Sequence, residues 1–405
     1  MLLRLAIESL SAIDAGPVES ENAPPGPIGH PPADAPANYR PDRSPADTPE
    51  VSRVAVVMPT YNRARWLAEA FDALAEQSFQ DFRLIVIDDG STDDTADRAA
   101  DHIAAAPFPA TLLRQRNRGP GPARQAGVDH ALSSDDPLAD ATDYLAFYDS
   151  DDRWAPHHLA DCVAEFDRHA DVDWVFASVR IVDQTIGDTL VPDVFTKPGT
   201  PRPILDPALA QARGDLRVLT HPDTLAHQLA GDNLAGFQTS VIRRRVFDPA
   251  RDGQSPPPLR IPGVGGEDRV FTALALTHGY RLAYLPAIHA DYRVHPGNNS
   301  GADAHLSWPK RRRTLRRHSF GLRYLRRAID PRTHPAAHRL ATDALARHLF
   351  WHLGYHSLPH EPAHALGTMR RALSLSPGHP DRWKTYAGAR LRHLGATTRQ
   401  LRRAA

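Results

Sequence analysis

The feature that most constrains the fold is a regular alternation of apolar runs and helical patterns in the first half of the chain. Val54–Met58, Leu84–Ile87 and Tyr144–Tyr148 consist almost entirely of aliphatic and aromatic residues, as expected of strands buried on both faces. Residues 64–77 have apolar side chains at helical spacing, and residues 92–106 begin with the acidic residues common in a first helical turn. This order predicts an α/β fold with a doubly wound sheet.

The remaining chain continues this pattern with one interruption. The same criteria predict strands at residues 111–115, 174–182, 237–242 and 282–292, and helices at residues 123–132, 157–169 and 268–277. Residues 187–235 are punctuated by Pro and Gly and have only short helical patches, so we expect an insertion over the site rather than a core layer. Beyond Ser307 the pattern is helical to the end, broken at Pro331, Pro359, Pro377 and Pro380.

Composition divides the chain into three predicted regions: a Pro-rich arm (1–50), an α/β domain (51–305) and a basic helical region (306–405). Residues 16–50 hold ten prolines and almost no large apolar residues, which predicts disorder. Residues 301–405 hold twenty-one basic and five acidic side chains, although the whole chain has zero formal charge. Such a tail suggests a nucleic acid, an anionic membrane surface or an acidic partner, although a solvated helical face is the commoner explanation. We expect no nucleic acid partner.

Cysteine content and hydropathy indicate the compartment. The single cysteine, Cys162, excludes an intramolecular disulfide and favours a reducing cytoplasm, and we expect it in the core. Arg4, Glu8 and Asp14 interrupt the apolar start of the chain, so it lacks a long signal-peptide core. No segment reaches the roughly 18–20 apolar residues of a membrane span. We therefore expect a cytoplasmic protein, peripheral to the inner face of the membrane if the basic tail binds lipid.

Three carboxylates follow the run Tyr144–Tyr148 within four positions: Asp149, Asp151 and Asp152, with Ser150 between them. Open α/β sheets bind ligands at the edge where such strands end. Crowded carboxylates repel one another, so the cluster fits a hard divalent cation with a phosphate group beyond it. An Asp-rich turn that caps the following helix remains an alternative.

Polar residues also follow the first two predicted strands. The first junction, residues 59–63, lacks the Gly-x-Gly-x-x-Gly pattern of dinucleotide folds. Tyr61 offers a face for a base, and Asn62 offers amide groups to bond it. Asp88 and Asp89 suit a base N–H or ribose hydroxyls, although either could simply cap the next helix. Arg124 lies in the first turns of its helix, where it could face phosphate.

These motifs together resemble family 2 glycosyltransferases of the GT-A fold. The resemblance covers about residues 54–300 and rests on the motifs in order: residues 54–63, 88–93, 117–124, 149–152, 265–268 and 292–300. It implies a Rossmann-like mixed sheet flanked by helices, here with a C-terminal helical extension. Each motif alone is weak, but their order and approximate spacing match the family.

The resemblance also assigns roles to individual residues. It places the nucleotide sugar against Thr60, Tyr61, Asn62, Asp89, Arg124, Asp149, Ser150 and Asp152. Asp149 and Asp151 would form the D-x-D motif, with Asp151 as a direct ligand of Mn²⁺ or Mg²⁺. His295 would ligate the metal or bond the diphosphate. Asp268 would be the general base, beside Glu267. From spacing alone an acidic first helical turn is the simpler explanation of that pair, but the upstream motifs favour the base.

The function expected from this resemblance is inverting, metal-dependent sugar transfer. A nucleotide-sugar donor, preferably a UDP-sugar, would react with a hydroxyl of a glycan, lipid-linked or other acceptor. A metal-dependent nucleotidyltransferase is one alternative, but such enzymes tend to carry a Gly-rich basic loop that residues 59–63 lack. A non-catalytic GT-A scaffold that binds through its basic tail is the other.

Overall fold

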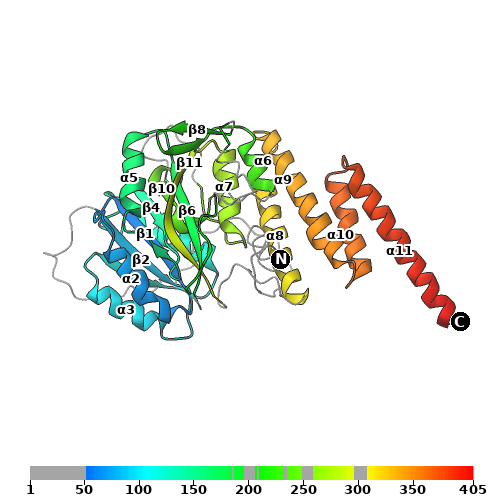
Figure 1. Cartoon of the computed structure of the whole chain (residues 1–405), viewed down its shortest axis with the longest axis horizontal. Coiled ribbons are helices and arrows are strands. Elements are labelled where there is room, and N and C mark those ends of the chain that lie inside the picture. Colours follow the sequence, from blue (N-terminus) through cyan, green and yellow to red (C-terminus); the bar gives the residue numbers. More distant parts are fainter. Residues whose placement is uncertain are drawn as a thin grey trace.

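The computed structural model describes residues 52–184, 187–195, 206–207, 209–230, 235–248, 259–295 and 308–404. The predicted disordered arm, residues 1–50, and the end of the 292–300 motif lie outside these ranges. The described residues form one eleven-stranded mixed sheet with helices on both faces, followed by a series of C-terminal helices (Figure 1). The predicted fold class is confirmed.

The first half of the sheet is parallel, in the order β3-β2-β1-β4. Its strands are β1 (Val54–Thr60), β2 (Phe82–Asp88), β3 (Ala110–Arg114) and β4 (Tyr144–Phe147). The connections contain η2 (Ala64–Trp66), α2 (Leu67–Ala75), α3 (Thr95–Ala105) and α4 (Pro120–Ala131). Every residue of β2 and β4 is buried, as the apolar runs predicted. Because these strands are parallel, the residues that follow them meet at one edge.

The second half of the sheet makes it mixed. β10 (Val241–Arg243) runs antiparallel between β4 and β6 (Trp174–Asp183), and β6 pairs in parallel with β11 (Leu282–Val294). Two register shifts interrupt this pairing between Leu285 and Ala290. The short β5 (Arg153–Trp154) pairs with β11. The flanking elements are α5 (His158–Arg168), η4 (Phe237–Thr239), η5 (Arg244–Val246) and α7 (Glu267–Thr277).

Two sequence predictions are wrong in this half. The segment 187–235 does contribute to the sheet: β7 (Thr189–Val191) pairs with β6, while β9 (Leu216–Leu219) and β8 (Ala210–Arg213) extend it beyond β11. Leu216 and Val218 are fully buried and Arg217 between them is only partly buried, as expected when successive side chains of a strand point to opposite faces. The helix α6 (Thr224–Ala230) follows. The predicted strand at 237–242 begins instead as η4, and only β10 is extended.

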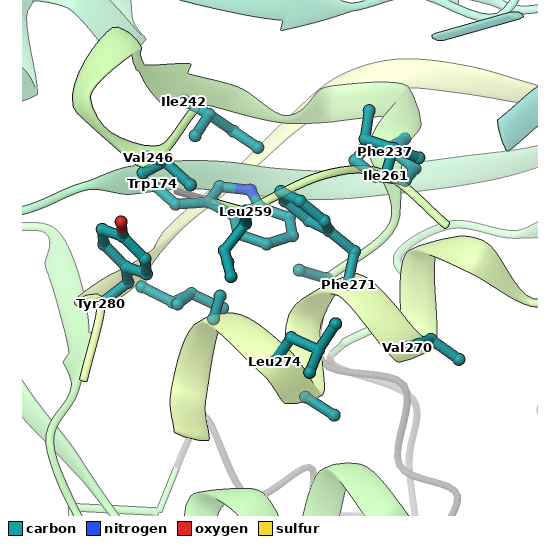
Figure 2. Packing of buried hydrophobic residues seen from close by; sticks show 14 of the residues in the cluster. Trp174, Phe237, Ile242, Val246, Leu259, Ile261, Val270, Phe271, Leu274 and Tyr280 are labelled. Atoms are coloured by element: carbon teal, nitrogen blue, oxygen red, sulfur yellow. The ribbon is translucent and has the colours of Figure 1, made fainter. Parts of the chain in front are cut away.

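Aromatic packing holds α7 against the sheet. Figure 2 shows Trp174 of β6 beside Phe237 and Phe271, and the Trp174 and Phe271 ring centroids are 5.6 Å apart. All three side chains are almost fully buried. Aromatic pairs at this separation add roughly 0.5–1.5 kcal/mol beyond the area that they bury. This packing fixes α7 against the sheet, and with it the position of Glu267 and Asp268 in its first turn.

Some of the C-terminal helices pack on the sheet domain, and others extend away from it. They are α8 (Trp308–Ala328), α9 (Pro335–Arg347), a π-helix (His348–Gly354), η8 (Tyr355–Ser357), α10 (Pro362–Leu375) and α11 (Pro380–Ala404). Leu325, Ile329 and Ala341 belong to the same buried cluster as the sheet. Only α10 and α11 extend well away from it (Figure 1). Among the described residues, no helix combines the length and apolar character needed to cross a membrane.

Candidate active site

Residues predicted for the site meet at the carboxyl edge of the parallel strands. The loop after β4 contributes Asp149 and Asp151, the end of β11 leads to His295, α4 contributes Arg124, and the start of α7 contributes Glu267. Hydrogen bonds connect them in two sets, one around Asp151 and one around Arg124. The tertiary structure thus brings together motifs that are far apart in sequence.

Asp151 is the centre of the first set. Its Oδ2 accepts a bond from Arg63 Nε at 2.9 Å and lies 3.2 Å from His295 Nε2. Burial alone would raise the pKa of Asp151, but the hydrogen bond from His295 and the charge of Arg63 outweigh it and lower the pKa. Asp151 is therefore ionised, and an ionised carboxylate is the kind of ligand that a hard cation prefers. The His295 ring packs on Trp66, with ring centroids 4.9 Å apart.

Arg63 was missed as a site residue in the sequence. The sequence signal that could have found it is its place directly after Tyr61 and Asn62, just beyond the end of β1. From there a basic side chain can reach the loop after β4, the strand beside β1 in the sheet. Arg63 also donates its backbone N–H to Thr95 Oγ1 at 2.8 Å, which fixes this turn to the start of α3.

Arg124 is the centre of the second set. Its side chain is buried, and its two terminal nitrogens each lie 2.5 Å from a carboxylate oxygen, one of Asp149 and one of Glu267. Its guanidinium carbon stands 5.0 Å from the Phe237 ring centroid. The sequence placed Arg124 against phosphate, whereas here both arms of the guanidinium bond protein carboxylates. Its contact with nucleotide stays a prediction.

Asp152 points away from both sets. It is buried, its Oδ1 accepts the Arg293 backbone N–H at 3.1 Å, and its Oδ2 has no hydrogen-bond partner among the described residues. Burial raises the pKa of Asp152 well above its usual range, and the neighbouring charges of Asp151 and Asp149 raise it further. Asp152 therefore favours its neutral form and joins the loop to β11. Ser150 between these residues is buried.

Asp152→Asn is expected to stabilise the ligand-free chain, and more so at about pH 8 than at about pH 5. The folded state raises the pKa above that of an unfolded aspartate, about 4. The stabilisation from this group is therefore complete below that value and is lost as the pH rises toward the folded pKa. Asparagine stays neutral throughout. Melting temperatures of both proteins at both pH values measure this, and a less stable variant at the higher pH would contradict it.

Asp89 organises the loop that leads into α4. It is buried, and it accepts bonds from Gln115 Nε2 at 2.7 Å and from the backbone N–H groups of Arg118 and Gly119 at 2.9 and 2.8 Å. Burial raises the pKa of Asp89, and these hydrogen bonds oppose the shift. Gly119 has a φ of 90°, a conformation that other residues rarely adopt. A ribose contact of Asp89 stays a prediction.

The turn after β1 presents the remaining predicted nucleotide residues. Asn62 has a φ of 52°, and its Oδ1 accepts the Thr92 backbone N–H at 2.8 Å. Tyr61, just before it, is 40% exposed, and Thr60, the last residue of β1, is buried. Stacking of a base on Tyr61 stays a prediction.

Glu267 and Asp268 begin α7 with different surroundings. Gly266 precedes them in the left-handed region, with a φ of 70° and no side-chain cap. Glu267 is buried against Arg124, while Asp268 is half-buried and accepts the Arg269 backbone N–H at 2.7 Å. Asp268 is thus the more accessible carboxylate, although it also satisfies one N–H of the first helical turn.

The predicted metal ligands only partly converge. Asp151 and His295 are in contact, whereas Asp149 turns to Arg124. Among the described residues, the only groups of three His, Cys, Asp or Glu ligand atoms within 4.8 Å of one another lie elsewhere, around His289. The donor set nevertheless fits Mn²⁺ or Mg²⁺, because ionised carboxylate oxygens are the ligands that such cations prefer.

Comparison with known proteins supports the family resemblance over part of the chain. Residues 55–206, fewer than half of the chain, match the model of the family described as Glycosyl transferase family 2. Succinoglycan biosynthesis protein ExoW of Rhizobium meliloti is 34% identical over 130 residues, which cover 32% of this chain and 38% of ExoW. An uncharacterised glycosyltransferase of Nostoc sp. is 32% identical over 131 residues, with the same coverage.

Solved structures extend the likeness beyond the family 2 segment. TarS of S. aureus, residues 1–349, solved with UDP-GlcNAc, has a TM-score of 0.52 and 16% identity, covering 80% of this chain and 81% of the TarS fragment. This likeness identifies the GT-A fold. The sequence matches, by contrast, span only 38% of the length of ExoW and of the Nostoc protein.

Proposed function

We propose that the chain is an inverting glycosyltransferase that moves a sugar from a nucleotide-sugar donor to an acceptor hydroxyl. The observation that carries this proposal is the convergence of Asp151, His295 and Arg63 beside Asp149, Arg124 and Glu267 on the family 2 sheet edge. A nucleoside diphosphate needs cationic groups and a divalent ion, and a sugar transfer needs a base nearby. This edge of the sheet carries cationic side chains, carboxylates that could hold a divalent ion, and a carboxylate that could act as the base.

The residues would have different roles in the proposed reaction. Tyr61 would stack on the base, and Arg63 and His295 would lie near the diphosphate. Asp151 would hold Mn²⁺ or Mg²⁺, with Asp149 toward the ribose or a metal-bound water, and the ion supplies neutralisation of the departing diphosphate. Asp268 would take the proton of the acceptor hydroxyl as this oxygen attacks the anomeric carbon in line. No covalent enzyme intermediate is required.

Glu267 would act through Arg124 rather than on substrate. Both arms of the guanidinium are used, so Glu267 and Asp149 hold Arg124 between the start of α7 and the loop after β4. Removing one member of a buried ion pair typically costs about 3–5 kcal/mol. The pair therefore positions Asp268 relative to the metal-binding loop.

A screen of nucleotide sugars by thermal unfolding tests the donor class. We prefer a UDP-sugar, a choice with which the UDP-GlcNAc complex of TarS is consistent. A ligand that binds only the folded state at 100 times its Kd stabilises it by about 2.7 kcal/mol. We expect stabilisation by one nucleotide class and its dependence on Mn²⁺ or Mg²⁺. Absence of stabilisation by every nucleotide sugar would count against the proposal.

The basic helix α8 supports docking to an anionic membrane surface, where a lipid-linked acceptor would be found. Lys310, Arg311, Arg313 and Arg316 are exposed on it. A pocket of about 280 Å³ between α8, the π-helix and α10 is lined by Arg316, Arg323, Arg371 and apolar side chains including Phe320, which is 58% exposed. In the part of the chain that the structure describes, these three arginines have no carboxylate partner. Cationic and apolar groups together suit an anionic amphiphile.

Vesicle flotation tests this docking with matched charge removals. Replacing Arg311, Arg313 and Arg316 by Gln should weaken binding to anionic vesicles about fivefold per residue, since each surface cation contributes about 1 kcal/mol. The control replaces three exposed arginines of the sheet domain, Arg98, Arg116 and Arg118, by Gln. Failure of the unmodified chain to bind anionic vesicles at low salt would discard the docking proposal and leave α8 as a solvated face.

A further inference from the structure

A second group of ligand-type side chains lies where α5 meets β11, and the proposed transfer reaction does not use it. His158 and Cys162 are four residues apart on α5, so both face the same side of the helix. His289 of β11 lies against them. All three side chains are completely buried. Such a concentration of imidazole and thiol groups in a core requires an explanation.

The distances among these side chains match those of a metal-binding site. His158 Nδ1 and His289 Nδ1 are 3.0 Å apart, and Cys162 Sγ is 3.8 Å from His158 Nδ1. All three ligand atoms lie within 4.8 Å of one another. With Zn–N of about 2.0–2.1 Å and Zn–S of about 2.3 Å, tetrahedral angles give about 3.3 Å between nitrogens and about 3.6 Å from nitrogen to sulfur. Small side-chain adjustments would therefore suffice.

A hydrogen bond between the two rings pairs their Nδ1 atoms but does not involve the third side chain, Cys162, whose Sγ lies 3.8 Å from His158 Nδ1. The Nε2 atoms of both rings are buried without a hydrogen-bond partner among the described residues, and an ion bound at Nδ1 would leave them as they are.

We propose that His158, Cys162 and His289 bind one Zn²⁺ ion through Nδ1, Sγ and Nδ1. Imidazole and thiolate are typical zinc ligands. Binding removes the thiol proton, which passes to solvent, because the thiolate is the ligating form. A water takes the fourth tetrahedral position. This ion would join α5 to β11, and it is distinct from the Mn²⁺ or Mg²⁺ proposed at Asp151.

Asp161 balances the charge of this zinc site. Two neutral imidazoles, one thiolate and Zn²⁺ leave a single positive charge, and Asp161 Oδ2 lies 3.5 Å from His289 Nε2. With Nδ1 on zinc, His289 would carry its proton on Nε2, on the side of this carboxylate, although no hydrogen bond joins the two groups in this structure. A carboxylate behind a ligating histidine is the usual arrangement at zinc centres.

A rival set shares one residue with the proposed site. His157, Asp161 and His289 also have ligand atoms within 4.8 Å, but His157 is exposed, and this set lacks the thiolate. His157 therefore provides a matched control. If the buried set binds the metal, replacing His157 leaves zinc in place, whereas replacing Cys162 removes it.

Metal analysis of the full chain, purified without a polyhistidine tag, tests the proposal. We expect roughly one zinc ion per chain in the unmodified protein, in His157→Ala and in Asp151→Ala, and loss of zinc in Cys162→Ser and His289→Gln. Circular dichroism checks that each variant is folded. Replacement of zinc by Co²⁺ should add a thiolate-to-cobalt charge-transfer band that His157→Ala retains.

Three results would overturn the proposal. One is an unmodified chain that takes up no zinc and shows no such cobalt band after supplementation. Another is a folded Cys162→Ser that keeps its zinc, and the third is loss of zinc in His157→Ala, which would favour the rival set. Should Cys162→Ser fail to fold, the cobalt spectrum of the unmodified chain decides whether Cys162 is a ligand.

Discussion

Asp268→Asn is expected to lower sugar transfer by about 10²–10⁴-fold while nucleotide affinity stays nearly unchanged. Asparagine keeps the shape of the side chain but cannot accept the acceptor's proton. Asp268 is half-buried at the start of α7, and the residues predicted to bind nucleotide lie on other elements, so we expect donor binding not to depend on it. Product formation at saturating donor, measured with nucleotide titration of the same variant, separates the two effects.

Two control variants define what Asp268 does. Asp97→Asn changes an exposed carboxylate on α3 and should leave turnover unchanged. Glu267→Gln weakens the buried pair with Arg124 and should lower thermal stability as well as turnover. Near-normal turnover in Asp268→Asn would reject the base assignment, because Asn serves as well as Asp at a helix start. Joint loss of turnover and nucleotide binding would indicate a structural role instead.

Asp151→Ala is expected to abolish the part of nucleotide affinity that depends on divalent metal and to lower turnover by about 10²-fold or more. The variant also removes the carboxylate that Arg63 and His295 now bond. The Arg63 and His295 side chains would then be available to phosphate, so nucleotide binding in the absence of metal should persist or strengthen. The decisive quantity is therefore the ratio of UDP affinities with and without Mn²⁺, measured by calorimetric titration.

Asp152→Asn is the matched control for the metal experiment. Asp152 is adjacent in sequence and buried, but it bonds the β11 backbone rather than the Arg63 and His295 side chains. Its variant should keep the metal dependence of UDP binding. Equal UDP affinity of the unmodified chain with and without Mn²⁺ would remove the metal from the proposal. Loss of metal dependence in Asp152→Asn instead of Asp151→Ala would transfer the ligand role to Asp152.

The amino-acid sequence by itself determined the central strands and the edge at which the site lies. Val54–Met58, Leu84–Ile87 and Tyr144–Tyr148 are continuous apolar runs, and only a sheet covered on both faces buries such runs completely. Helical segments between them make the strands parallel, so the polar residues that follow each run must meet at one edge. Asp89 and Asp151 were predicted for this reason.

Only the tertiary structure decided what each of these side chains contacts. Asp149, Asp151 and Asp152 lie within four positions, yet they bond Arg124, the Arg63 and His295 pair, and the β11 backbone. These partners are as many as 144 residues away in the chain, and local spacing carries no information about them. The same reason explains β8 and β9: β9 is a strand because the edge of β11 pairs with it, and β8 pairs in turn with β9.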